Sequence, residues 1–135
     1  MGAWGTGVFD NDGAGDFLAL LQGAEPGQRE VVIREAFEAV TDPDDYLEVD
    51  AGQEAIAAAA VIAAVHNNRP VTDQDSVFTF AAADLPPATP ELRTLAVDAL
   101  NRVTGPESEW RELWEETDDF DTALAAVNAV RSALA

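Results

Sequence analysis

The run Ala55–Val65 contains only alanine, valine and isoleucine, and it constrains the fold more than any other segment. Asp50 and Gln53 have the spacing of a capping box, so a helix is predicted from about Asp50 to His66. Such a helix is apolar nearly all round, and it is stable in water only when other elements cover it. The sequence therefore predicts a helix at the centre of the domain, ended by Asn67–Asn68, a residue type that accepts a left-handed backbone.

Five further segments combine apolar residues at one-turn spacing with capping residues before them and chain breakers after them. Helices are expected from a cap at Asp10 or Asn11 to Gly23, from Pro26 to Asp42, from Pro90 to Gly105, over Trp110 to Trp114, and from Phe120 to Leu134. The predicted class is all-α, an irregular bundle of about six helices that forms a single domain over residues 1–135.

Residues 69–89 give two interpretations. Val77, Phe78 and Phe80 are β-prone, which favours a short extended piece within Val71–Phe80. A long loop that packs Phe78 and Phe80 into the core fits the same residues. Both alternatives leave the helical class unchanged.

The first residues of the chain form a glycine-rich aromatic segment. Gly5 and Gly7 permit positive backbone dihedrals, which would turn Trp4 and Phe9 back onto the core. The alternative is a loop that cradles a ligand. A nucleotide-binding P-loop is excluded because the chain contains no lysine.

Charge is the second strong signal. Aspartate and glutamate number 26 against seven basic residues, all of them arginine, and the formal net charge is -19. Such a surface repels phosphate backbones and anionic lipids, so neither a nucleic acid nor a membrane is expected as a partner. A basic protein or a bound cation would suit it. The lack of cysteine and of a signal-peptide pattern is typical of a cytoplasmic protein.

Two motifs and the alanine-rich run carry a family resemblance. The first motif is Trp4, Gly5, Thr6, Gly7, Phe9, Asp10, Asn11 and Asp12; the second is Ser108, Glu109, Leu113, Trp114, Glu115 and Glu116. With Ala55–Ala64 between them, the chain resembles the bacterial domain-of-unknown-function 4259 family (DUF4259). The resemblance implies a fold and brings no established activity.

Asp10, Asp12 and Asp16 are the candidate metal ligands. Their spacing is similar to a calcium-binding loop, but Ala14 and Leu21 occupy two of its ligand positions. The alternative is that these acids cap the first helix and offset its dipole. A zinc site of common type needs more than the single histidine, His66.

Glu112, Glu115 and Glu116 form a cluster with Trp110 and Trp114. One interpretation is a buried Trp110 and Trp114 with solvated acids. The other is an aromatic cleft in which two carboxylates bind a sugar or act as acid and base.

No catalytic residue set and no cofactor is predicted, and the pattern specifies no oligomeric state. The favoured function is a non-catalytic binding or regulatory protein for a basic protein, for example an immunity-like protein that neutralises a basic toxin. The alternative is a carboxylate-based divalent-cation-binding protein or enzyme. The candidate binding residues are Trp4, Gly5, Gly7, Asp10, Asp12, Trp114 and Glu115.

Overall fold

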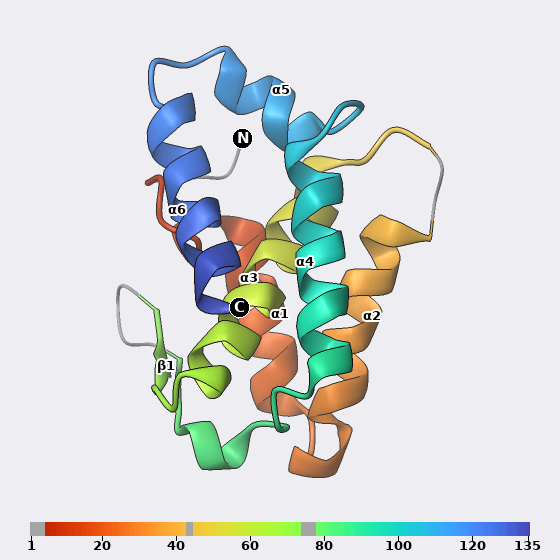
Figure 1. Ribbon diagram of the computed structural model, residues 1–135, viewed down its shortest axis with the longest axis vertical. Coiled ribbons are helices and arrows are strands. Elements are labelled where there is room, and N and C mark those ends of the chain that lie inside the picture. The colour runs from red at the N-terminus through yellow and green to blue at the C-terminus, as the bar shows by residue number, and fades with distance from the viewer. Residues whose placement is uncertain (1–4, 43–44, 74–77) are drawn as a thin grey trace.

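The computed structural model describes residues 5–42, 45–73 and 78–135. Within these ranges, six α-helices are joined by two short 3₁₀ helices and one small hairpin. In chain order the elements are α1 (Asp12–Gly23), η1 (Pro26–Gln28), α2 (Arg29–Thr41), α3 (Val49–His66), β1 (Val71–Thr72), β2 (Thr79–Phe80), η2 (Ala82–Asp84), α4 (Pro90–Thr104), α5 (Glu109–Glu115) and α6 (Phe120–Ala133). The prediction of an all-α, irregular six-helix bundle is confirmed (Figure 1).

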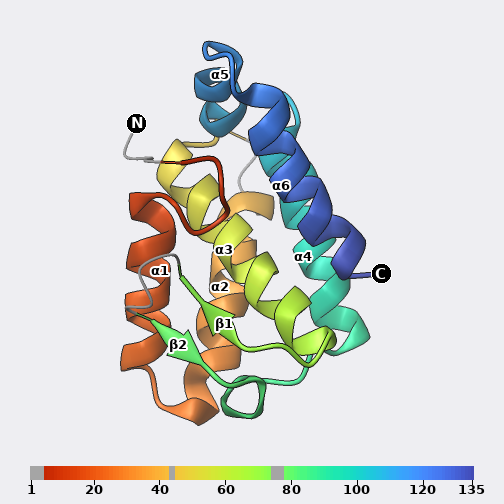
Figure 2. The ribbon, with the colours of Figure 1, turned by 90° about the vertical axis from the view of Figure 1, so that its left-hand side faces the viewer.

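The alanine-rich helix α3 lies in the middle of the bundle (Figure 2). It contacts α1, α2, α4, α5 and α6, and every residue from Ala55 to Ala63 is buried. Small side chains on all sides of α3 let these neighbours approach closely. Among the described residues, α3 is also the one helix long and apolar enough to cross a membrane by length and composition. Its burial explains that composition, because the central helix of a bundle must be apolar all round.

Local capping signals set the starts of two helices. Asn11, rather than Asp10, caps α1, with its side-chain oxygen accepting a hydrogen bond from the Ala14 amide at 2.8 Å. Thr89 caps α4 in the same way. Pro26 opens η1 instead of α2, which begins three residues later at Arg29. At the end of α3, Asn68 has φ 54°, in the left-handed region expected of it.

The segment after α3 contains a hairpin towards the end of the molecule opposite α5 (Figures 1 and 2). β1 and β2 pair antiparallel, with Val71 opposite Phe80. This pairing confirms the extended interpretation, and the side chains of both residues are buried; Val77 lies outside the described residues. Arg29 holds the hairpin to α1: its guanidinium lies 5.3 Å from the Phe80 ring centroid, and its Nε donates to the Leu21 carbonyl.

Candidate functional site

The N-terminal segment folds around the carboxylate of Asp10. The Gly7 amide donates to Asp10 Oδ2 at 3.1 Å, and the Asp10 amide donates to the Gly7 carbonyl at 3.0 Å. A Cβ atom added at Gly5 or Gly7 would lie 2.7 or 2.5 Å from Asp10 Oδ2. Neither glycine has a φ between +20° and +160°, so the prediction of a left-handed backbone at these positions is wrong. A side chain at either position would push the Asp10 carboxylate away, so glycine leaves room for the hydrogen bond from the Gly7 amide.

The three acids proposed as metal ligands are not brought together. Asp10 points into its own turn, while Asp12 and Asp16 are exposed on α1. Within the described ranges, no group of three or more histidine, cysteine, aspartate or glutamate side chains is arranged to hold a metal ion. Asp12 lies in the first turn of α1, where a negative charge stabilises the helix dipole.

The two motifs of the sequence meet in space. Val8 and Phe9 pack against the core, and the segment covers α5 and α6. Between the described residues of the two motifs lies a cavity of about 10 Å³, lined by Thr6, Gly7, Val8, Asn11, Ile56, Trp110, Trp114, Ala123 and Val127. Such a space holds at most one water molecule. Trp114 is 7% exposed and therefore part of the core, whereas Trp4 lies outside the described residues.

The second motif also supplies a cap for the central helix. Leu47 and Ser108 form a parallel bridge, in which the Glu109 amide donates to the Leu47 carbonyl at 2.8 Å. This bridge places Glu109 Oε1 2.8 Å from the Val49 amide, at the first turn of α3. Glu48 occupies the N-cap position without a side-chain bond. The cap of α3 thus comes from a residue 60 positions along the chain.

The predicted capping box at Asp50 and Gln53 is wrong, because neither residue caps α3. α3 begins at Val49, so Asp50 lies inside its first turn. Gln53 is 2% exposed, and its Oε1 accepts a hydrogen bond from the Gly13 amide of α1 at 3.1 Å. Its polar group therefore joins two helices instead of capping its own.

Glu109→Ala is expected to lower the free energy of unfolding by about 1–2 kcal/mol, the usual effect of losing an N-cap acceptor. Glu109→Gln keeps an oxygen at this position and should lose less. Urea unfolding followed by circular dichroism measures both. The control is Glu116→Ala, an exposed acid at the end of α5, with an expected change within about 0.5 kcal/mol. Equal effects of Glu109→Ala and Glu116→Ala would contradict the capping role.

Helix α5 lies at one end of the molecule (Figure 1), and the residues within it, after it and beside it include six exposed acids and one exposed aromatic residue. We call this surface the acidic end; it consists of Tyr46, Glu112, Glu115, Glu116, Asp118, Asp119 and Asp121. The Tyr46 hydroxyl donates to Glu112 Oε2. This hydrogen bond, together with desolvation and the charges of Glu112, Glu109 and Glu116, raises the pKa of Tyr46 to about 12. Tyr46 was not singled out from the sequence, because nothing in its local pattern shows that Glu112 lies beside it.

The pKa of Tyr46 is directly measurable, since it is the only tyrosine. Ultraviolet titration of the phenolate should give about 12 in the folded protein. Glu112→Ala should move this pKa towards the ordinary value of about 10, and the control Asp121→Asn should leave it unchanged. The neutral phenol is favoured by folding, so its stabilising contribution is complete below about pH 10 and is lost as the pH rises through about 12. An ordinary pKa in the unaltered protein would contradict the Tyr46–Glu112 contact.

The arginines leave most of the acidic charge unpaired. Among the described residues, carboxylates pair only with Arg34, which contacts Glu30 and Glu91, and with Arg111, whose Nε lies 3.1 Å from Glu115 Oε1. Main-chain carbonyl oxygens accept hydrogen bonds from Arg29, Arg93, Arg102 and Arg111. The guanidinium groups thus hold chain ends and loops together, and the negative surface potential stays largely uncompensated.

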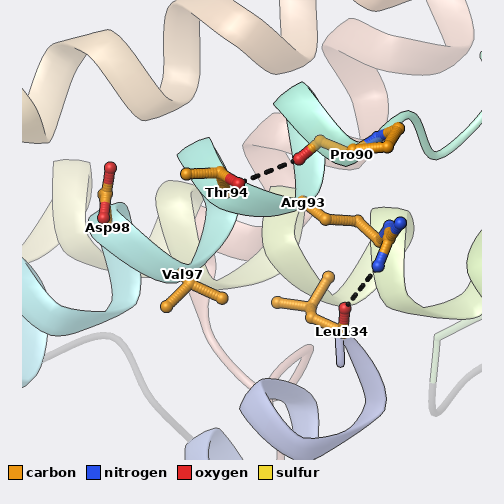
Figure 3. A pocket seen from close by; sticks show the side chains of 6 residues that line it. All are labelled: Pro90, Arg93, Thr94, Val97, Asp98 and Leu134. Atoms are coloured by element: carbon orange, nitrogen blue, oxygen red, sulfur yellow. Dashed lines mark hydrogen bonds between the residues drawn. The ribbon is translucent and has the colours of Figure 1, made fainter.

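A shallow pocket of about 290 Å³ lies between α4 and the end of α6 (Figure 3). Arg93 Nη1 donates to the Leu134 carbonyl at 3.3 Å, and the Thr94 hydroxyl donates to the Pro90 carbonyl at 2.9 Å. These polar groups are already bonded to backbone, and Asp98 stands apart from them at the rim. The pocket therefore lacks the converging polar groups that a specific ligand site requires.

The fold and its surfaces define a small acidic helical domain built around a buried alanine-rich helix. The model of the family described as "Domain of unknown function (DUF4259)" matches residues 2–126, and the chain belongs to this family. Neither the curated proteins nor the solved structures contain a significant match.

Proposed function

We propose that this protein is a non-catalytic binding protein whose acidic end docks a basic protein. The observation that carries this proposal is the concentration of exposed carboxylates around α5, of which only Glu115 has an ion-pair partner among the described residues. Unpaired carboxylates on one surface attract a basic partner over long range and fix its orientation. A basic toxin neutralised by an immunity-like protein is one partner of this kind.

Tyr46 gives the acidic end a suitable anchor. It is 48% exposed, it is flanked by Glu112, and its phenol stays neutral over the physiological pH range. An aromatic ring beside carboxylates binds a lysine or arginine through both its face and the adjacent negative charge. Tyrosine is among the residues that contribute most to binding at interface centres.

The acidic end also has rigid support. Trp110 and Trp114 bury one side of α5 in the core. Arg111 lies 5.4 Å from the Phe120 ring centroid and donates to the Thr104 carbonyl, which joins α5 to α6 and α4. A partner would therefore meet side chains whose backbone is already ordered, and ordering would cost little on binding.

The test uses a fluorescent peptide of alternating lysine and glycine and follows its anisotropy at low and physiological salt. The acidic-end variant carries Glu112→Gln, Glu116→Gln, Asp118→Asn and Asp119→Asn. The distal control variant carries Glu25→Gln, Glu38→Gln, Asp84→Asn and Asp98→Asn, so both lose the same charge from exposed acids. The acidic-end variant should bind at least about tenfold more weakly, which corresponds to roughly 1.4 kcal/mol. Equal losses in the two variants would contradict a defined docking surface.

Titration with Ca²⁺ and Mg²⁺ in a calorimeter separates this proposal from the divalent-cation alternative. Binding heat that disappears in Asp12→Asn would favour a carboxylate metal site on α1. Binding of the basic peptide without such heat would favour the docking surface.

A further inference from the structure

A second surface, distinct from the acidic end, combines apolar walls with carboxylates. α1 and α2 both pack on α3, and a groove of about 160 Å³ lies between them. Phe17 and Leu20 of α1 and Val32 and Ala36 of α2 form its apolar walls; Glu35 of α2 and Glu54 of α3 supply its charges. Figure 2 shows the three helices side by side.

The charges of this groove have no counterion in the part of the chain that the structure describes. Among the described residues, neither Glu35 nor Glu54 has an ion pair or a side-chain hydrogen bond. Partial burial, and then the charges of Asp16 and Asp50, raise the pKa of Glu54. A carboxylate in this position costs stability when ionised, and an added cation would remove that cost.

The apolar wall is also left open. Leu20 is 60% exposed, the largest exposed fraction among the exposed large hydrophobic side chains of the described residues. Covering it with a further apolar group would be favourable. A ligand that matches the groove therefore needs an apolar stem and a positive end.

We propose that the groove between α1 and α2 binds a lysine side chain of the basic partner, with its methylenes along Leu20 and Val32, above the buried Phe17, and its ammonium at Glu35 and Glu54. This inference rests on the function proposed above. Lysine side chains commonly bury their stem against apolar surface while the ammonium reaches a polar edge.

The sequence itself argues for a foreign source of this lysine. The chain contains none, so neither an intramolecular contact nor a second copy can supply one. A second copy would also bring another net charge of -19. Divalent metal fits less well, because the described residues hold no group of three ligating side chains.

The experiment is a titration of the ¹⁵N-labelled protein with lysine capped at both ends, followed by amide chemical shifts. Capped norleucine, which keeps the butyl stem but lacks the ammonium, is the matched control. Capped lysine should shift the amides of Phe17, Leu20, Val32 and Glu54 with a dissociation constant in the millimolar range. Capped norleucine should bind at least about fivefold more weakly, a difference of roughly 1 kcal/mol.

Glu54→Gln and Glu35→Gln should each weaken capped-lysine binding severalfold, while the acidic-end variant should bind as the parent does. Thermal melting checks that both glutamine variants fold. Because Glu35 is exposed, Glu35→Gln is expected to fold and still tests the proposal if Glu54→Gln is destabilised. Shifts located elsewhere, or unchanged in both variants, would overturn the groove assignment. Groove binding of capped lysine without peptide binding at the acidic end would instead count against the proposed function alone.

Discussion

A Gly13→Ala protein is expected to be less stable than the parent by about 2 kcal/mol, although alanine is the better helix former. Gly13 lies where α1 crosses α3. An added Cβ would be 2.6 Å from Gln53 Cβ and 3.1 Å from the Asp50 carbonyl oxygen. Neither atom is the far end of a flexible side chain, so the two helices must separate. Separation also lengthens the hydrogen bond from the Gly13 amide to Gln53 Oε1, now 3.1 Å and buried.

The same helix offers a matched control. Gly15 also lies within α1, and a Cβ there would meet nothing within 4 Å. Gly15→Ala should therefore raise the free energy of unfolding by about 0.5–1 kcal/mol through helix propensity alone. Urea unfolding of the two variants should give changes of opposite sign. A stabilising effect of both substitutions would show that α1 and α3 do not approach as closely as the structure indicates.

The sequence predicts the helices of this protein better than the contacts between them. Local signals predict most of the helices. Asn11 and Thr89 cap the helices that follow them, because each side chain reaches a backbone amide only three residues away. The alanine-rich run was correctly placed at the centre, because its composition leaves no polar face. These inferences need only the periodicity and ends of each helix.

The errors concern residues whose partners are distant in the chain. Gln53 and Glu109 contact residues 40 and 60 positions away, and no local pattern encodes either contact. The prediction of a capping box is wrong because the Gln53 side chain accepts a hydrogen bond from the Gly13 amide of α1. The sequence predicts that Gly5 and Gly7 serve the backbone dihedrals, whereas in the structure they leave room for the Asp10 carboxylate. In each case the fold, not the helix propensity, decides the role of the side chain.

The sequence predicts only part of the acidic end, for the same reason. The sequence points to Glu115 and the two tryptophans of α5, but Tyr46 precedes α3 and reaches them through the bridge between Leu47 and Ser108 and its own hydrogen bond to Glu112. The structure divides α5 and the residue after it into a buried side, Trp110 and Trp114, and an exposed acidic side, Glu112, Glu115 and Glu116. This division favours a surface made of acids and Tyr46, supported from beneath by the tryptophans.

Trp114→Ala is the substitution with the largest expected effect, a loss of about 3–5 kcal/mol in the free energy of unfolding. The side chain is 7% exposed and lines the cavity of about 10 Å³ beneath the N-terminal segment. Its removal leaves a void that Thr6, Gly7 and Val8 cannot fill, because they have small side chains or none. Such a loss is a large share of the 5–15 kcal/mol typical of a domain. Denaturant unfolding measures it, and Trp114→Phe should recover part of it.

Peptide binding distinguishes a supporting Trp114 from one that contacts a ligand. Denaturant unfolding gives the fraction of Trp114→Ala that is folded at low temperature. Once corrected for this fraction, the affinity of Trp114→Ala for the basic peptide should equal that of the parent. The affinity should fall instead in Tyr46→Ala, whose side chain is 48% exposed and whose removal should change stability little. Unchanged stability with lost binding in Trp114→Ala would place the tryptophan in the ligand site and contradict its role as buried support. Trp114→Ala is expected to lower stability and Tyr46→Ala to lower peptide affinity. Measuring both quantities for each variant therefore separates packing from recognition at this end of the molecule.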